Sequence, residues 1–210
     1  MLIGGGYTPL IRFKGFEDEW MTIKLCDISK KVIEKNATSV CQDVFTNSAE
    51  FGVINQRDFF DHDVANVDNI QGYYIVRPND YVYNPRISTT APVGPINRNK
   101  LGCCGVMSPL YYVFRVEKQS DGILHFLDYY FKSNMWHDFM FKNGNSGARS
   151  DRFSISDSTF SLMPILYPQK EEEQLNIGQV FINMEKLMRT ESIKLSKFRS
   201  MKQSLLQKMF

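Results

Sequence analysis

The sequence has no long apolar run and no strong excess of either charge. Its 210 residues include 25 Lys and Arg against 23 Asp and Glu, which gives a formal net charge of +2. This balance alone predicts no class of partner, because charge acts through its local distribution. No apolar run approaches the roughly 18 residues of a membrane helix, and the opening MLIGGGYTPL lacks the regions of a signal peptide. We therefore expect a cytoplasmic protein with no membrane partner.

Metal-ligating residues are scarce and poorly spaced. The cysteines are Cys26, Cys41, Cys103 and Cys104, and the histidines are His62, His125 and His137. No CxxC motif and no Cys/His pair has the spacing of a zinc site, so we predict reduced thiols and no metal. His62 lies in the tripeptide DHD and is expected in a surface loop. His125 and His137 are more than three helical turns apart, too far to share a ligand.

The motifs of catalysis and nucleotide binding are also missing. The glycines at positions 4–6 are followed by Tyr7, Thr8 and Pro9, not by the Lys-Ser/Thr pair of a phosphate loop. The sequence contains no nucleophile elbow and no methyltransferase cofactor loop. We predict that this chain catalyses no reaction by itself and binds no cofactor.

Strand-forming residues dominate the chain from about residue 50 to 166. Segments rich in Val, Ile, Tyr and Phe, such as GYYIVRPNDYVYNPR and MSPLYYVFRVEK, are separated by Pro, Asn, Asp and Gly. The stretch ILHFLDYYFKSNMWHDFMF predicts one amphipathic helix over residues 123–141. Nearer the start, MTIKLCDISKKV fits either a short helix or a strand followed by a loop. Residues 1–167 are thus predicted to form an α+β domain with a mixed sheet.

From residue 168 to 210 the pattern becomes helical. Three consecutive glutamates, residues 171–173, suit a helix start, and no proline follows Pro168. Gly178 is expected to weaken the helix without breaking it. Apolar residues then recur as in a coiled-coil seam, at Met184, Leu187, Met188, Leu195, Phe198, Met201, Leu205 and Met209. Because a long helix is marginal in water unless its stripe is buried, we predict a partner helix.

Three polar segments are candidates for ligand binding. They are NQRD at 55–58, RPNDYVYNPRISTTAPVGPINRNK at 77–100, and FKNGNSGARSDRF at 141–153. Their Arg, Lys, Asn and Gln side chains are the types that bind phosphates and read base edges, and glycine lets a backbone approach a ligand closely. The same composition also fits solvated loops of a β protein, so composition alone leaves both interpretations open.

The segment PLIRFKGFEDEWMTIKLCDI, residues 9–28, resembles the N-terminal signature of the specificity (S) subunits of type I restriction-modification systems. The blocks GYYIVRPNDYVYNPR, GVMSPLYYVFRV, GARSDRFSIS, LMPILYPQKEEEQLNIGQVF and SLLQKMF follow in the family's order. The resemblance therefore covers almost the whole chain. Cys26 stands where the family usually has glycine, a departure expected to alter one backbone turn.

The resemblance implies a DNA target recognition domain at residues 1–167 and a helical spacer and dimerisation region at residues 168–210. A full-length S subunit has two such halves and reads a two-part DNA site, with antiparallel spacer helices setting the distance. Methyltransferase (M) and restriction (R) subunits dock on it, and S-adenosylmethionine, ATP and magnesium belong to those partners. This chain is similar to half an S subunit. It is either a half-size protein that forms a homodimer or part of a longer chain that pairs with a second half.

On this interpretation, loops of the recognition domain contact double-stranded DNA. The candidates are Gln56, Arg57, Asn84, Arg86, Ser88, Thr89, Lys142, Asn143, Asn145 and Arg149. We expect loop 84–89 and loop 143–149 to face the same DNA segment. The basic residues of the last helix are interpreted as solubilising flanks of a coiled coil or as weak contacts to the DNA backbone. The opposing interpretation is a structural or protein-interaction module that pairs through its helix without touching DNA.

Overall fold

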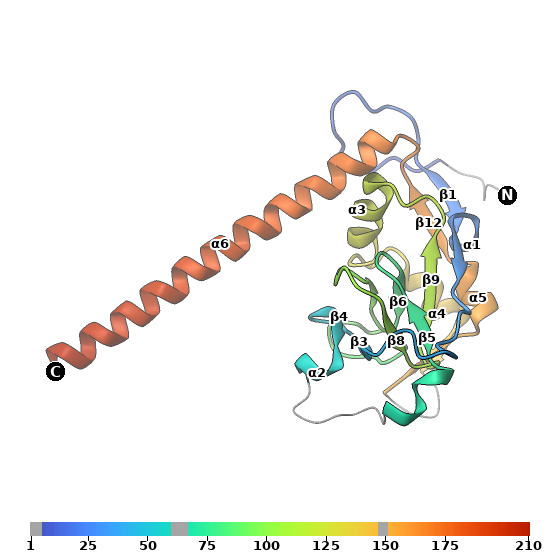
Figure 1. The fold of residues 1–210 in the computed structure, drawn as a ribbon. Helices are drawn as coiled ribbons and strands as arrows, with labels where there is room; N and C mark the ends of the chain where they lie inside the picture. The colour runs from blue at the N-terminus through green and yellow to red at the C-terminus, as the bar shows by residue number, and fades with distance from the viewer. Residues whose placement is uncertain (1–5, 60–66, 147–150) are drawn as a thin grey trace.

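The computed structural model of the chain describes residues 6–59, 67–146 and 151–210, and a long C-terminal helix extends from its body (Figure 1). The first elements are β1 (Met21–Lys24), α1 (Leu25–Ile28), β2 (Ser29–Lys31), β3 (Phe45–Ser48), β4 (Gly52–Asn55), α2 (Gln56–Phe59), the 3₁₀ helix η1 (Val67–Gly72), β5 (Tyr74–Val76) and β6 (Tyr81–Tyr83). They are followed by β7 (Ile96–Arg98), β8 (Gly105–Met107), β9 (Tyr112–Val116), α3 (Asp121–Tyr130), α4 (His137–Asn143), β10 (Asn145–Ser146), β11 (Phe153–Ser154), α5 (Asp157–Ser161), β12 (Pro164–Tyr167) and α6 (Glu171–Met209).

The strands form one four-stranded sheet and several two-stranded pairs. The larger sheet has the order β2-β9-β6-β7, and the pairs are β1-β12, β3-β4, β5-β8 and β10-β11. Named strands pair antiparallel, and one isolated parallel bridge joins Val44 to Val106. The pairing of β1 with β12 brings the two ends of the segment 21–167 together, with Met21 opposite Tyr167. The predicted α+β fold with a long C-terminal helix is confirmed.

The ambiguous segment at residues 21–32 contains both kinds of element. β1 leads into the single helical turn α1, which is followed directly by β2. The backbone N–H of Lys24 donates to the Asp27 carboxylate at 3.0 Å, and Leu25 is buried in the core. Cys26 is exposed within this turn. Because a helical turn needs no left-handed backbone conformation, cysteine fits there as well as glycine.

The prediction of one helix over residues 123–141 is wrong. The chain forms α3, then a turn, then α4. Within the turn, the Ser133 hydroxyl donates to the Tyr130 carbonyl at 2.6 Å, a local bond that competes with helix continuation. Trp136 is fully buried and donates from Nε1 to the Phe131 carbonyl at 3.2 Å. Burial of this indole therefore fixes the turn, and Met135, which the helical pattern placed on the apolar face, is exposed.

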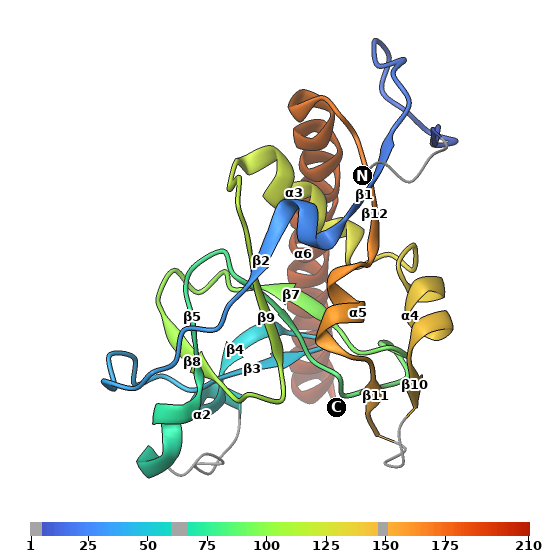
Figure 2. The same ribbon diagram turned by 90° about the vertical axis from the view of Figure 1, so that its right-hand side faces the viewer.

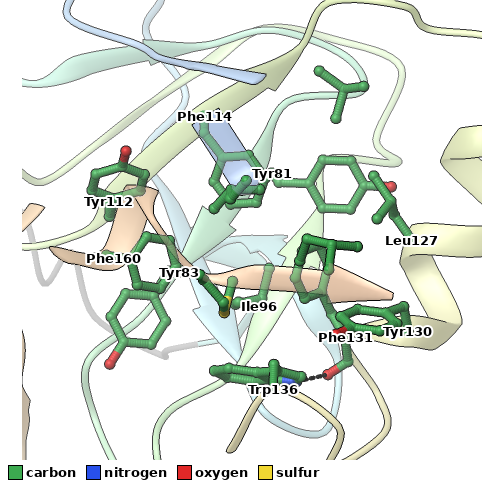
Figure 3. Close-up of a cluster of buried hydrophobic side chains, with 14 of the residues drawn as sticks. Tyr81, Tyr83, Ile96, Tyr112, Phe114, Leu127, Tyr130, Phe131, Trp136 and Phe160 are labelled. Carbon is green, nitrogen blue, oxygen red and sulfur yellow. Dashed lines mark hydrogen bonds between the residues drawn. The ribbon is translucent and has the colours of Figure 1, made fainter. Parts of the chain in front are cut away.

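Aromatic side chains fill the core between the four-stranded sheet and helices α3, α4 and α5 (Figure 3). Tyr81 stacks on Phe114 with ring centroids 5.4 Å apart, and Tyr83 stacks on Phe160 at 4.7 Å. Rings of this size each bury about 150–250 Å². The Tyr81 hydroxyl donates toward the Leu124 carbonyl at 3.0 Å, so the ring ties the sheet to α3, and its burial raises the Tyr81 pKa.

Helix α6 is continuous over 39 residues, and its first turns pack on the rest of the protein, chiefly against α3 (Figure 1). Gly178 allows this approach, because a Cβ there would lie 2.4 Å from the His125 Cβ. Beyond it, Tyr129 of α3 stacks on Phe181 at 4.9 Å. From residue 183 to 210 every residue is exposed. None of the described helices is long and apolar enough to span a membrane.

Candidate nucleic-acid interface

Two of the polar segments lie side by side at one end of the body, where β10 and β11 form a short hairpin (Figure 2). The backbone N–H of Ile87 donates to the Asp151 carbonyl at 3.0 Å, and that of Phe153 donates to the Pro85 carbonyl at 2.8 Å. Arg86 and Arg152 face each other as an antiparallel bridge. The segment that follows β6 therefore runs antiparallel beside the hairpin, joined to it by this isolated bridge and by backbone hydrogen bonds.

Asn84 positions this segment from inside. Its amide donates to the Asn47 carbonyl at 2.8 Å, and its Oδ1 accepts from the backbone N–H of Arg86 at 3.0 Å. Asn47 is itself buried and donates to the Val82 carbonyl at 2.7 Å. The Asn84 side chain, predicted to contact DNA, thus stabilises the turn through these two hydrogen bonds.

Arg86 is the most accessible cation of this segment. Its side chain is 71% exposed and lies 3.5 Å from the Asp151 carboxylate. An exposed ion pair of this kind is weak, so it leaves the guanidinium available to a stronger acceptor. Ser88 and Thr89 are also exposed, in a tight turn where the Ser88 hydroxyl accepts from the backbone N–H of Ala91 at 3.1 Å.

The other predicted loop begins at the end of α4. Lys142, Asn143 and Asn145 are exposed, and the Asn143 amide donates to the Phe139 carbonyl at 2.8 Å. Gly144 is required by close packing, because a Cβ there would lie 2.4 Å from the Phe153 ring. Lys142 and Asn143 end α4 just before the hairpin, and Asn145 belongs to its strand β10. This hairpin contacts the Arg86 segment. Arg149 and His62 lie outside the described residues.

Gln56 and Arg57 belong to α2, which lies on the β3-β4 side of the body, away from β10 and β11 (Figure 2). Arg57 is exposed. Gln56 is half-buried, with its amide 3.4 Å from the Phe45 carbonyl. Its Oε1 is buried without a hydrogen-bond partner among the described residues. Among the described residues, the predicted DNA-contacting side chains therefore fall into two groups.

Much of the basic segment 77–100 is buried or already paired with a carboxylate. Arg98 donates from Nε and Nη2 to the Asp128 carboxylate at 2.9 and 2.7 Å, and Lys100 lies 2.7 Å from the same carboxylate. Arg77 pairs with Glu34 at 2.8 Å. Tyr81, Tyr83 and Asn99 from this segment are buried. Its composition therefore overstated the number of side chains that can meet a ligand.

A groove of about 290 Å³ lies beside the hairpin. Its lining includes Lys31, Tyr74, Tyr112 and Arg152. The Lys31 ammonium pairs with Asp157 and lies 5.5 Å from the centre of the Tyr112 ring, and burial raises the pKa of Tyr112 to about 12. Lys31 was not among the predicted residues, because a lysine in the SKKV segment carries no sequence signal that it will lie near the hairpin.

The residues of the N-terminal signature are placed elsewhere, at the base of α6. Arg12 donates from Nε and Nη2 to the Glu173 carboxylate at 2.7 and 3.0 Å. Trp20 donates from Nε1 to the same carboxylate at 3.2 Å. This cluster anchors the start of α6. No group of three or more His, Cys, Asp or Glu in the described part of the chain is arranged to hold a metal ion.

Comparison with known proteins gives matches at the level of structure alone. No family model matches the sequence, and no curated protein matches it. A solved chain from a study of complex assembly and conformational transition of the type I R-M system aligns with a TM-score of 0.56 and 12% identity, covering 88% of this chain and 46% of that one. The two chains share a fold.

The HsdS subunit from Thermoanaerobacter tengcongensis aligns with a TM-score of 0.48 and 14% identity, covering 87% of this chain and 41% of that one. The chain thus spans about half the length of the type I R-M chains that it matches. The first of these alignments bears out the fold that the sequence resemblance implied.

Proposed function

We propose that this chain is a DNA-reading specificity subunit of a type I restriction-modification complex. The observation that carries the proposal is the packing of the Arg86 segment against the β10-β11 hairpin. It gathers Arg86, Lys142 and Asn145, all exposed, from two distant parts of the sequence. Arginine, lysine and asparagine are the residue types that hold phosphates and read base edges in the major groove.

In this proposal, residues 1–167 read one half of a two-part site and residues 168–210 pair with a second helix. The exposed stripe on α6 supports the pairing, because an apolar face this long is stable in water only when covered. The partners are double-stranded DNA, the M subunit and the R subunit, and the second helix comes from another copy or another half. S-adenosylmethionine, ATP and magnesium are bound by the M and R subunits.

The test has two steps. First, N6-methylated adenines are mapped in the source genome with and without this gene, which gives the target sequence, its symmetry and its spacing. Second, binding of the purified protein with its M subunit is measured by fluorescence anisotropy on that duplex and on a scrambled duplex at stated salt. We expect tighter binding to the mapped duplex. Equal binding to both duplexes, or methylation that is unchanged without the gene, would instead favour a protein-interaction module.

A further inference from the structure

The exposed seam of α6 is interrupted by two charges. Positions spaced alternately by four and three residues form the seam of a coiled coil. From residue 184 onward these positions are Met184, Met188, Glu191, Leu195, Phe198, Lys202, Leu205 and Met209. The apolar members are between 50% and 73% exposed. Glu191 and Lys202 therefore lie where a partner helix would bury them.

We infer that α6 pairs antiparallel with α6 of a second copy, in the register that places Glu191 opposite Lys202 of the other helix. In an antiparallel pair each layer joins an early seam position to a late one. In this register Met184 faces Met209, Met188 faces Leu205, and Leu195 faces Phe198 of the second copy. The two-fold axis generates each layer a second time, so Glu191 and Lys202 of each chain both face an opposite charge. The inference rests on the proposed function, which requires two paired helices, and adds their partner and register.

Other arrangements leave the charges uncompensated. In a parallel, in-register pair, Glu191 would face Glu191 and Lys202 would face Lys202, and like charges in a desolvated layer repel. If the antiparallel register moved by one heptad, Lys202 would face Phe198 or Met184, and Glu191 would face Met209 or Leu195. A buried charge without a partner is strongly unfavourable. The pair of charges therefore selects both the direction and the register.

The positions that flank the seam are compatible with this register. On one side, Leu187 lies beside Lys208 and Lys194 beside Met201 of the second copy. On the other side, Glu185 lies beside Leu206 and Ser192 beside Arg199. No flank brings like charges together. The long lysine and arginine stems can cover apolar neighbours while their charged ends stay in water.

In the single chain, Glu191 pairs with Lys194 at 2.7 Å. Both side chains are 58% exposed, and exposed pairs one helical turn apart contribute little. Glu191 can therefore leave Lys194, or share it, when a second helix binds, at a small cost in free energy.

Charge reversal in the full chain tests the register. Sedimentation equilibrium is measured for the wild type, Glu191→Lys, Lys202→Glu, the double variant and an equimolar mixture of the two single variants. Each single variant places like charges in two layers, and we expect its dimer Kd to rise at least about tenfold. The mixture and the double variant each restore opposite charges in both layers, so their Kd should return to within about threefold of the wild type.

Lys186→Glu is the matched control, since the same change on the outer face of α6 should leave the dimer Kd unaltered. Far-UV circular dichroism verifies that each variant stays helical. The inference is overturned if the wild type is monomeric at micromolar concentration, if the single variants dimerise normally, or if the mixture fails to recover. Specific DNA binding without this dimer would overturn this inference and leave the proposed function standing, whereas a correct dimer without specific DNA binding would overturn only the proposed function.

Discussion

Arg12 and Glu173, which are 161 positions apart in the sequence, form a two-point ion pair at the base of α6 with distances of 2.7 and 3.0 Å. The Glu173 side chain is 2% exposed and also accepts from the Trp20 indole. Two of these residues belong to the N-terminal signature of the sequence. The signature therefore marks the joint between the body and the long helix.

Replacing Glu173 by Ala should loosen this joint. The Arg12 guanidinium and the Trp20 N–H would both lose their acceptor, and polar groups left unpaired in a buried site are costly. We expect a melting temperature lower by several degrees and faster amide exchange in residues 7–20. Glu172→Ala is the matched control, because Glu172 is exposed on the same turn. Equal effects of both substitutions would show that the ion pair does not hold the joint.

Gly178→Ala should destabilise the protein although alanine is the better helix former. The gain in helix propensity is about 1 kcal/mol. The added Cβ would lie 2.4 Å from the His125 Cβ and 3.0 Å from its backbone carbon, and overpacking of this kind costs about 1–3 kcal/mol. Urea unfolding should show a net loss on the order of 1 kcal/mol. Ser196→Ala, on the exposed part of α6, should show no loss. A stabilised Gly178→Ala variant would contradict the close α3–α6 contact.

Arg86→Ala and Arg149→Ala test DNA reading directly. If either side chain reads a base, its loss should weaken binding by about 1–3 kcal/mol and relax specificity at that base pair. If it holds a phosphate, all sequences should weaken about equally and the salt dependence should flatten. Anisotropy titrations at several salt concentrations separate these outcomes. Lys14→Ala removes one charge at the other end of the body and should have little effect. Unchanged binding in both arginine variants would reject this interface.

Asn84→Ala should act on stability first. Its side chain donates to the Asn47 carbonyl and accepts from the Arg86 backbone, and loss of such bonds costs about 1 kcal/mol. Thr89→Ala, in the same loop but exposed, should leave the unfolding free energy within about 0.5 kcal/mol. A stable Asn84→Ala variant with weakened DNA binding would instead favour direct contact by the asparagine.

Acid should weaken the contacts at the base of α6. The hydrogen bond from the Lys118 ammonium, at 2.6 Å, holds the Glu171 pKa below its ordinary 4.5. Burial raises the pKa of Glu185, but hydrogen bonds from Lys132 and Tyr129 outweigh it and lower the pKa overall. A carboxylate with a depressed folded-state pKa stabilises the fold above its ordinary pKa, and this contribution is lost as pH falls through the depressed value.

Thermal melting between pH 7 and pH 3 measures this effect. The melting temperature should be constant down to about the ordinary carboxyl pKa and then fall. In Lys118→Met, which removes the partner of Glu171, the fall attributable to Glu171 should disappear. An identical pH profile for this variant and the wild type would contradict the assignment.

Local periodicity was enough to predict the strand-rich character of residues 50–166, the α6 stripe and the position of its start, because these features depend on spacings within a few residues. It was not enough for residues 123–141, where Ser133 and the buried Trp136 end one helix and begin another. Glu191 and Lys202 occupy positions of the same seven-residue repeat as the apolar stripe. Which residues of a partner helix they face depends on the order of the sequence and on the direction of that helix.

Which polar side chains are accessible to a ligand was decided by tertiary structure. Arg86 and Arg98 lie in the same basic segment of the sequence. Arg98 is held by Asp128, 30 residues away, whereas the Arg86 side chain is 71% exposed. The contact between Pro85 and Phe153 likewise joins segments that no local pattern connects. A buried charge needs an opposite charge, and the chain supplies that partner from a distant position only after it has folded.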